Sequence, residues 1–589
     1  MLKVYKNLKP FIFYIILVVI FTGIQALLQL RLPKIMGNMV NQGVMTQDVD
    51  FVMSEGLEML VVTGISAVFT VLGSFFAAKA SIGLGKILRN KIFKKIESFS
   101  LNEFDKFGTA TLVTRSTNDI MQIQQVTFMI LRMVVLALVT SIGGIYYAVT
   151  TDLKLSAIFL VVVPVMACAI LIIGTKAVPL FKVMQKKLDK INLVSREGLT
   201  GVRVIRAFNR TNYEANRFEE ANIDYTDTAI RVNKLLALLM PIIMLVMNLM
   251  SVGILWFGTK RFDVSIQEMI INGTEIGFNF GNIMEFIQYA FQVMFSLLMV
   301  TMMFIMIPRA QASAQRINEV LETEPSINDL NNITQDEDMN TKKGYVEYKN
   351  VEFSFHGAEE PAIKNISFNS KPGEVTAIIG GTGSGKSTII NLIPRFYDAQ
   401  SGEILVDGVN VKDLSQAELR EKIGYVPQTA VLFSGTIAEN IRYGKKDATV
   451  EEIEQALKIA QATEFVSEMK DGLDSMIAQG GTNISGGQKQ RLSIARALVR
   501  KPEIYIFDDS FSALDFKTDA KLRAALKQET KNSTVIIVAQ RVSTIMDADK
   551  ILVLDEGRIV GEGTHKELMK NCETYKEIVS SQLSEEELS

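Results

Sequence analysis

The stretch EVTAIIGGTGSGKSTIINLI, residues 374–393, decides the fold of the C-terminal half of this chain of 589 residues. Its apolar beginning, EVTAIIG, predicts a buried β-strand, and its end, IINLI, predicts a helix. Between them lies GGTGSGKST, Gly380–Thr388, which matches the pattern G-x-x-x-x-G-K-[ST]. The strand, loop and helix context is the one that a phosphate-binding loop requires, and it disfavours the alternative of a glycine-rich turn without a ligand.

The loop residues are of the types that hold phosphate and magnesium. Glycines let backbone N–H groups close around phosphate oxygens, and the start of the following helix adds positive potential. We expect Lys386 to neutralise the terminal phosphates and Ser387 to offer its hydroxyl to Mg²⁺. The candidate binding residues of the loop are Gly380, Thr382, Gly383, Ser384, Gly385, Lys386, Ser387 and Thr388.

An acidic residue at the end of a second strand supports this site. The run IYIF, Ile504–Phe507, predicts an apolar strand that ends at Asp508. An aspartate at a strand end is often only a turn residue. Coupled to a phosphate loop, it is placed to hold Mg²⁺ directly or through water. Short apolar strands alternate with helices from Tyr345 onward, which predicts a soluble α/β domain.

The first 308 residues have a different character, because they contain six stretches of 19 to 25 residues without Asp, Glu, Lys or Arg. About 20 helical residues cross a hydrocarbon core of ~30 Å, so each stretch can span a membrane. Buried helices of a soluble core are the disfavoured alternative. The predicted spans are 11–30, 59–78, 133–151, 155–175, 235–259 and 286–308. Because no span carries a charged residue, a proton-coupled or ion-channel mechanism is not expected.

The basic residues orient these spans. Lys79–Arg132 and Lys176–Lys234 are rich in Lys and Arg, whereas the other connections between spans carry few. The positive-inside rule therefore places both termini and these two long loops in the cytoplasm. Helical periodicity in the loops predicts helices that extend from the membrane. We expect a transmembrane domain at 1–322, a polar linker at 323–344, the α/β domain at 345–582 and an acidic tail at 583–589.

The composition excludes several other classes of protein. The chain has 62 Lys and Arg against 64 Asp and Glu, so no net basic character points to nucleic acid. Its two cysteines cannot form a disulfide framework or a four-ligand zinc site of their own. Its two histidines leave almost no room for histidine-based chemistry within the chain.

Further motifs occur in one order along the α/β domain: Gln428 in YVPQ, a Ser485, Gly486, Gly487 and Gln488 motif in ISGGQKQR, Asp508, and Asp515 in SALD. With the phosphate loop, they make the chain resemble the ATP-binding cassette family. Over nearly all residues the chain looks like a half-size exporter, a helical membrane bundle of six spans fused to one α/β nucleotide-binding domain. The resemblance, which is to bacterial heterodimeric multidrug exporters, implies ATP and Mg²⁺ as ligands. It also implies a multi-pass bacterial plasma membrane protein whose nucleotide-binding domain is cytoplasmic.

The resemblance also assigns roles. It implies that the Ser485 motif of one chain caps the γ-phosphate of ATP held by another chain, and that Gln428 joins Ser387 and Asp508 around Mg²⁺. Phe355 is expected to stack on adenine, where Tyr is usual, since stacking needs only the π face; packing in the core is the alternative. Coupling helices are expected within 104–119 and 195–209, in contact with the region of Gln428.

Two positions depart from the family pattern. The catalytic Glu that should follow the strand-end Asp is Asp509 here, and the switch His is Gln540. A carboxylate one methylene shorter retreats by about an ångström from the attacking water, which can cost on the order of 10²-fold in rate. Glutamine can donate a hydrogen bond but cannot carry charge or relay a proton. The two histidines, His356 and His565, lie elsewhere in the pattern and cannot replace it.

These departures predict a chain that binds ATP and hydrolyses it poorly. Because its Ser485 motif is intact, we expect a heterodimer with a second half-transporter that carries the consensus Glu and His. Slow turnover by a homodimer is the alternative.

The transported molecule is less constrained by the sequence. Gln25 and Gln29, like Gln288 and Gln292, are four residues apart and share a helix face. Methionines at 240, 244, 247 and 250, and again at 294, 299, 302 and 303, offer adaptable apolar surface; ordinary helix packing or lipid contact is the alternative for them. The expected cargo is a small amphipathic molecule, with membrane lipid as the other contact. An ATP-gated channel or sensor, an importer, and a lipid or peptide transporter stay open as alternatives.

Overall fold

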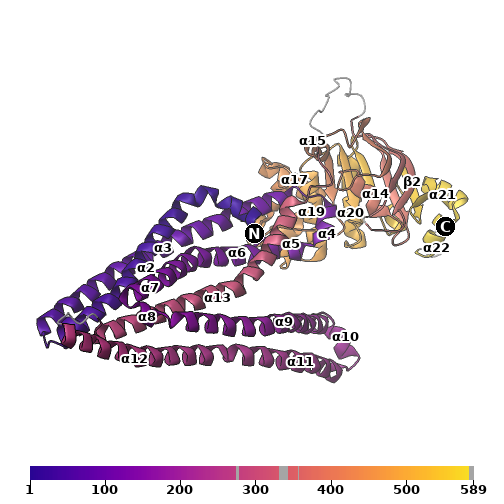
Figure 1. Cartoon of the computed structure of the whole chain (residues 1–589). Coiled ribbons are helices and arrows are strands. Elements are labelled where there is room, and N and C mark those ends of the chain that lie inside the picture. Colours follow the sequence, from indigo (N-terminus) through magenta and orange to yellow (C-terminus); the bar gives the residue numbers. More distant parts are fainter. Residues whose placement is uncertain (273–277, 330–342, 356, 583–589) are drawn as a thin grey trace. The chain divides into compact units, whose positions relative to one another are not determined.

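The computed structural model describes residues 1–272, 278–329, 343–355 and 357–582. The chain divides into two compact units (Figure 1). The first consists of Met1–Glu97 and Thr109–Thr323, and the second of Ser98–Gly108 and Glu324–Ser589. Most of the expected linker (330–342), His356 and the expected tail (583–589) lie outside the described residues.

The first unit is built from helices. Within the described residues, six helical segments are long and apolar enough to cross a membrane, and each contains one predicted span, which confirms the six-span architecture. The elements are α1 (Leu2–Tyr5), η1 (Lys6–Phe11), α2 (Ile12–Asn38), η2 (Met39–Val44), α3 (Val49–Glu97), α5 (Thr109–Ser116), α6 (Asn118–Met129), η3 (Ile130–Val134), α7 (Val135–Thr151), α8 (Leu153–Ser156), α9 (Phe159–Thr200), α10 (Val202–Ala207), α11 (Thr211–Ala237), α12 (Leu239–Asn272) and α13 (Phe280–Glu322).

Several of these helices are longer than a bilayer is thick. Helix α3 has 49 residues, which is roughly 70 Å at ~1.5 Å per residue, against a hydrocarbon core of ~30 Å. Helix α9, with 42 residues, runs beside α11 (Figure 1), and Lys187 pairs there with Asp224 at 2.6 Å. The predicted helical extensions beyond the membrane are therefore confirmed.

The predicted spans contain no Asp, Glu, Lys or Arg, but two charged side chains at flanking positions contact residues within them. Arg132 stands one residue before the third predicted span, in the π-helical turn η3. Its Nη1 nevertheless donates to the carbonyl oxygen of Thr70 at 2.8 Å and to the hydroxyl of Ser74, and both partners belong to the second span. Glu285, directly before the sixth span, is buried and accepts from the Thr151 hydroxyl at 3.4 Å. A charge-free window counts backbone positions, whereas a long side chain reaches beyond its own Cα.

The second unit is an α/β domain, as predicted. In its described part, the strands form a six-stranded sheet of order β12-β11-β3-β10-β9-β6, a four-stranded sheet of order β2-β1-β4-β5, and the pair β7-β8. The strands are β1 (Val346–Phe353), β2 (Ile363–Ser370), β3 (Val375–Gly380), β4 (Ser401–Val406), β5 (Val409–Asn410), β6 (Ile423–Val426), β7 (Gly435–Thr436), β8 (Met476–Ile477), β9 (Ile504–Asp508), β10 (Thr534–Val538), β11 (Lys550–Asp555) and β12 (Arg558–Gly563).

Helices cover these sheets, and one short helix from the first half of the sequence belongs to the same unit. The helices are α4 (Leu101–Phe107), α14 (Lys386–Leu392), α15 (Gln416–Glu421), α16 (Ile437–Arg442), α17 (Val450–Ile459), α18 (Thr463–Glu468), η5 (Gly472–Asp474), η6 (Gln479–Gly481), α19 (Gly486–Leu498), α20 (Phe516–Glu529), η7 (Val542–Thr544), α21 (His565–Asn571) and α22 (Glu573–Ser580).

The central strands of the six-stranded sheet are buried on both faces. Along β9, Tyr505 and Phe507 pack into one hydrophobic core, while Ile504 and Ile506 pack into the other. Side chains alternate across a strand, so a sheet between two cores must be apolar at successive positions. This requirement explains why IYIF and VTAIIG read as continuous apolar runs.

Candidate functional site

The predicted site residues follow strands that end at one edge of the six-stranded sheet. Strand β10 pairs in parallel with β3 on one side and with β9 on the other, and β9 pairs in parallel with β6. The carboxyl ends of these four strands therefore meet. The chain after β3 is the phosphate loop, and the other three strands lead to Gln428, Asp508 with Asp509, and Gln540. Ligands of open α/β sheets bind at this edge.

The loop folds around the ammonium group of Lys386. Its Nζ donates to the carbonyl oxygens of Gly380 at 2.9 Å and Gly381 at 2.7 Å. Burial lowers the Lys386 pKa from its ordinary value, and the carboxylates of Asp509 and Asp508 act in the opposite direction. Phosphate oxygens could replace the two carbonyl contacts and would further favour the charged form.

The loop backbone fits a phosphate group. Gly383 and Gly385 adopt φ of +83° and +95°, a region that side chains disfavour. A methyl group built on Gly385 would come within 2.8 Å of the Ala362 carbonyl oxygen, whereas the same group on Gly381 or Gly383 would meet nothing within 4 Å. Among the described residues, the buried Ser384 hydroxyl has no hydrogen-bond partner. Open space and an unsatisfied polar atom inside the loop are what an anion would use.

The chemistry of the neighbouring oxygen atoms fits Mg²⁺. The Ser387 hydroxyl donates to Asp508 Oδ1 at 3.0 Å, so both expected metal ligands already lie together. Burial raises the Asp508 pKa, and the Ser387 hydrogen bond acts against that rise. A cation placed here would favour the ionised carboxylate.

Gln428 and Asp509 contact each other in the same site. Gln428 Nε2 donates to Asp509 Oδ2 at 3.3 Å. The Asp509 side chain is buried and its φ is +45°, with its backbone N–H held by the Val538 carbonyl oxygen at 2.9 Å. The backbone of Asp509 thus adopts a strained left-handed conformation, and its carboxylate accepts a hydrogen bond from the Gln428 amide.

Gln540 differs from these residues because it is exposed. Its backbone carbonyl oxygen accepts from Gln582 Nε2 at 2.8 Å, and Gln582 Oε1 accepts from the Val542 N–H at 2.8 Å. These contacts hold the chain beyond β10 without using the Gln540 side chain, which belongs to the same strand-end edge.

The Ser485 motif lies at the start of α19. Ser485 caps the helix, since its hydroxyl accepts from the Gln488 N–H at 3.2 Å while Gln488 Oε1 accepts from the Ser485 N–H at 2.8 Å. This reciprocal capping box fixes the helix entry. Around Gly486, no atom lies within 4 Å of where a Cβ would be, so the motif presents an open face. In this chain none of the described hydrogen bonds joins the motif to the phosphate loop.

The remaining predicted residues fall into two groups. Phe355 follows β1 with 40% of its surface exposed, and it makes edge contacts with Phe353 at 5.0 Å and Tyr397 at 5.6 Å. An exposed ring of this kind fits both stacking and edge packing. Thr382 is exposed, Thr388 is buried within α14, and Asp515 caps α20 by accepting from the Thr518 N–H at 3.0 Å. Asp515 therefore has a local role in helix capping that the motif alone did not indicate.

Two polar residues that the sequence did not single out connect parts of the site. Gln490 Nε2 donates to the Pro427 carbonyl oxygen at 3.1 Å, which ties α19 to the segment of Gln428. The Ser510 hydroxyl donates to the Val426 carbonyl oxygen at 3.1 Å, which ties that segment to Asp509. Both side chains are buried. A glutamine or serine next to a motif carries no sequence signal for such nonlocal contacts.

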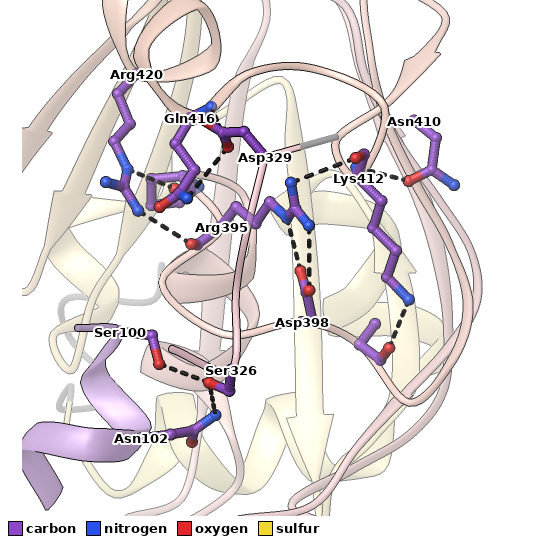
Figure 2. A network of polar contacts seen from close by, with 12 residues as sticks. Ser100, Asn102, Ser326, Asp329, Arg395, Asp398, Asn410, Lys412, Gln416 and Arg420 are labelled. Carbon is purple, nitrogen blue, oxygen red and sulfur yellow. Dashed lines mark hydrogen bonds and ion pairs between the residues drawn. The ribbon is translucent and has the colours of Figure 1, made fainter. Parts of the chain in front are cut away.

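A network of polar contacts holds α4 within the second unit (Figure 2). The Ser100 hydroxyl lies 2.7 Å from that of Ser326, and Asn102 Nδ2 donates to the Ser326 hydroxyl at 3.2 Å. Further along, Asp329 Oδ1 accepts from the Gln416 N–H at 3.0 Å. The described beginning of the expected linker is therefore fastened to this unit.

The stretch 104–119, where the first coupling helix is expected, holds the end of α4, which begins at Leu101, and all of α5. The described side-chain bond of α4 to the sheet region goes to Tyr397, whose hydroxyl donates to Asp105 Oδ2 at 3.0 Å. Burial and the neighbouring Asp105 raise the Tyr397 pKa to about 12, so the phenol stays a donor at neutral pH. The stretch 195–209, where the second coupling helix is expected, contains α10, which has no buried residue.

A six-span helical unit joined to a phosphate-loop domain defines a membrane transporter that uses a nucleotide. Residues 13–281 match the model of the ABC transporter transmembrane region, and residues 363–512 match that of the ABC transporter domain. The chain is 39% identical over 580 residues to an uncharacterized ABC transporter ATP-binding protein of Mycobacterium tuberculosis, with 98% of this chain and 97% of that protein covered. It belongs to the ABC transporter family.

Other similar proteins support this assignment to the ABC transporter family. An uncharacterized ABC transporter ATP-binding protein of Bacillus subtilis is 37% identical, with 100% of this chain and 99% of that protein covered. An ATP-dependent lipid A-core flippase of Pseudomonas fluorescens is 32% identical, with 89% and 84% covered. A bacterial Atm1-family ABC exporter solved with ATP bound shares the fold, with a TM-score of 0.79 at 24% identity and coverage of 98% and 99%. The chain is an ABC transporter of the plasma membrane with fused membrane and nucleotide-binding domains.

Proposed function

We propose that this chain is the subunit of a heterodimeric exporter that binds ATP tightly at its own site but hydrolyses it slowly. Its Ser485 motif completes the hydrolytic site of a second half-transporter. The observation that carries the proposal is a contrast within one sheet edge. Lys386, Ser387 and Asp508 lie together there and would hold phosphate and Mg²⁺. Asp509 and Gln540 stand where the family pattern has a Glu and a His.

The binding part of the proposal rests on the loop geometry. The Gly380 and Gly381 carbonyl oxygens hold Lys386 at the centre of the loop, where its charge can meet the terminal phosphates. Ser387 and Asp508, already within hydrogen-bond distance, would hold Mg²⁺, which supplies charge neutralisation at the phosphates when bound. Gln428 is the third expected ligand. The exposed ring of Phe355 is proposed to stack on the adenine.

Slow hydrolysis rests on two side chains. Asp509 is one methylene shorter than Glu, and Gln428 Nε2 lies 3.3 Å from its Oδ2. A general base must reach the water within hydrogen-bond distance, and a retreat of about an ångström costs on the order of 10²-fold. Gln540 can donate to a phosphate oxygen but adds no positive charge there. Both residues thus preserve binding contacts better than they preserve catalysis.

Two exposed surfaces support the need for a second chain. The open face of the Ser485 motif makes no described hydrogen bond to this chain's phosphate loop, so it is free to cap a nucleotide held by a partner. The turn around α10 exposes the apolar side chains of Leu199, Val204 and Phe208 by 78%, 60% and 73%. Apolar side chains at the tip of a long helical extension are typical of a contact surface. Both surfaces fit a dimer, and the altered Asp509 and Gln540 positions favour a partner that is not identical.

For the cargo, we propose small amphipathic molecules. Met240, Met244 and Met302 are more than half exposed on the helices of the first unit, whereas Met250 and Met294 pack into its core. The predicted methionine surface is therefore only partly available for contact with cargo, because some of its methionines serve helix packing. A lipid is the second candidate, because one relative is named as a lipid flippase.

A double substitution tests the proposal on the chain alone. Asp509→Glu with Gln540→His restores both catalytic groups, so the steady-state ATPase rate of the purified chain should rise by roughly 10²-fold. The variant Asp413→Glu, an exposed position away from the site, serves as the matched control. A wild-type chain that already hydrolyses ATP as fast as the double variant would overturn the proposed function.

A further inference from the structure

The guanidinium of Arg132 lies at a depth where a membrane protein normally excludes charge. Its two described hydrogen-bond partners are the Thr70 carbonyl oxygen, at 2.8 Å, and the Ser74 hydroxyl. Both stand inside the apolar stretch 59–78 of α3. A charged side chain inside a span is costly and marks a functional site by default.

A neighbouring helix fixes this depth independently. Gly73 stands between Thr70 and Ser74, and a methyl group built on it would come within 3.1 Å of the Thr22 hydroxyl oxygen on α2. Thr22 lies in the middle of the first apolar stretch, 11–30. The Arg132 side chain therefore reaches the central part of the spans instead of turning toward the cytoplasmic surface.

The described contacts leave half of the guanidinium unused. Nη1 makes both hydrogen bonds, and among the described residues no carboxylate pairs with Arg132 and no acceptor meets its Nε or Nη2. The Nε and Nη2 edge is the planar fork that matches the two oxygens of a carboxylate or phosphate. The contacts with α3 thus hold the side chain while its anion-binding edge stays free.

Unsatisfied polar atoms continue from this point along α2. Thr22 and Gln25 are buried, and their Oγ1 and Oε1 atoms have no hydrogen-bond partner in the described part of the chain. One turn further, the Gln29 carbonyl oxygen accepts from Gln292 Nε2 of α13 at 3.2 Å, while Gln292 Oε1 is buried without a partner. Residues 22, 25 and 29 share one helix face. Buried polar atoms without partners are costly unless a ligand meets them.

We propose that Arg132, with the Thr22 and Gln25 face of α2, forms a binding site for the anionic group of an amphipathic molecule. The class follows from the position: the free guanidinium fork selects a carboxylate or phosphate, and the surrounding spans require an apolar tail, because a hydrated inorganic anion does not enter a hydrocarbon layer. The π-helical turn that carries Arg132 also fits, since such turns are frequent at functional sites. The inference rests on the proposed export function and narrows its cargo to anionic amphiphiles.

The test is a titration of the purified full chain in phosphatidylcholine nanodiscs without nucleotide. Dodecyl phosphate should bind, the cationic analogue dodecyltrimethylammonium should bind about tenfold more weakly, and inorganic phosphate should not bind measurably. The substitution Arg132→Gln should weaken dodecyl phosphate binding by about tenfold and abolish the preference for the anion. Equal binding of both amphiphiles to the wild type would overturn the proposal.

Two matched variants separate binding from structure. Ser74→Ala removes one anchor of Arg132 but keeps the free fork, and Lys79→Gln removes a nearby cation that lies 4.8 Å from the Tyr14 ring. Both should leave dodecyl phosphate binding within about twofold of the wild type. A loss in Ser74→Ala as large as in Arg132→Gln would show that Arg132 acts only by holding α3 and would overturn the proposal. Arg132→Lys, which keeps the charge, provides a folded comparison if Arg132→Gln does not fold, and it should keep the preference for the anion.

Changing the lipid of the nanodisc shows whether the site takes a membrane lipid or a soluble amphiphile. If nanodiscs of phosphatidylglycerol weaken dodecyl phosphate binding by about tenfold through competition, the site takes a membrane lipid; if they do not, it takes a soluble amphiphile. Either result supports the anionic site. Because no nucleotide is present, failure of the heterodimer proposal would not change these affinities, and failure of this titration would not change the ATPase rates.

Discussion

The two ends of the nucleotide site, one for phosphate binding and one for activating water, differ in how many of the expected residues and contacts they have. At the phosphate end, Lys386 lies between two loop carbonyl oxygens and Ser387 bonds Asp508. At the end where water would be activated, Asp509 is held by an amide 3.3 Å away and the Gln540 side chain is exposed. Both ends belong to the same sheet edge, so the fold itself is not what separates them.

This difference indicates that binding a nucleotide and hydrolysing it depend on different residues of the site. Binding needs backbone N–H groups, one cation and a pair of metal ligands. These are supplied by the phosphate loop and by the end of β9. Hydrolysis needs a general base at the correct distance from one water molecule, and a side chain shorter by one methylene can lose that distance. An exporter built from two unlike chains can lose the second task in one chain while the other chain retains it.

The largest effect is expected from a substitution in the phosphate loop. Lys386→Ala removes the cation at the centre of the loop, so the Kd for Mg·ATP should rise by roughly 10²-fold, as for other buried charge partners. Isothermal titration of the purified chain measures it. Lys364→Ala, which removes a half-buried lysine paired with Glu360, is the control and should bind ATP normally. An unchanged affinity in Lys386→Ala would mean that the loop does not hold the terminal phosphates.

A smaller effect is expected from the metal ligand. Asp508→Asn keeps the shape of the side chain but loses the negative charge beside Ser387. The Mg²⁺ concentration that supports half-maximal ATP binding should rise by about tenfold. If ATP binding to this variant kept the magnesium dependence of the wild type, Asp508 would not belong to the metal site.

The smallest effect concerns the other end. If Asp509 is a poor base, as we propose, Asp509→Asn should lower the residual ATPase rate of the chain by less than about tenfold, whereas a working general base contributes ~10²–10⁴-fold. The affinity for ATP should stay the same. A loss of several hundredfold in rate would show that Asp509 is an effective base, and the contrast between the two ends would disappear.

Local patterns predicted much of this molecule. The phosphate loop, the strand that ends at Asp508 and the six spans each depend on residues close together in sequence, and the sheet order brings their predicted partners to one edge. The bond between Ser387 and Asp508 joins residues 121 positions apart, but both were recognisable because each belongs to its own motif.

Contacts that depend on reach or on distant segments were not predictable. Arg132 was counted outside the spans because its Cα precedes the apolar run, while its side chain bonds Thr70 and Ser74 within another span. The contact between Asp105 and Tyr397 joins α4 to a residue 292 positions away, and neither residue belongs to a motif. Gln490 and Ser510 likewise gain their roles only from the folded backbone.

The fate of ATP bound to the purified chain tests the central claim most directly. The chain is loaded with radiolabelled Mg·ATP at less than one equivalent, and the bound nucleotide is separated and identified over time. The account predicts that the nucleotide stays bound and is still mostly ATP after minutes. Conversion to ADP at a rate on the order of 1–10 s⁻¹, which is ordinary for an enzyme, would contradict it.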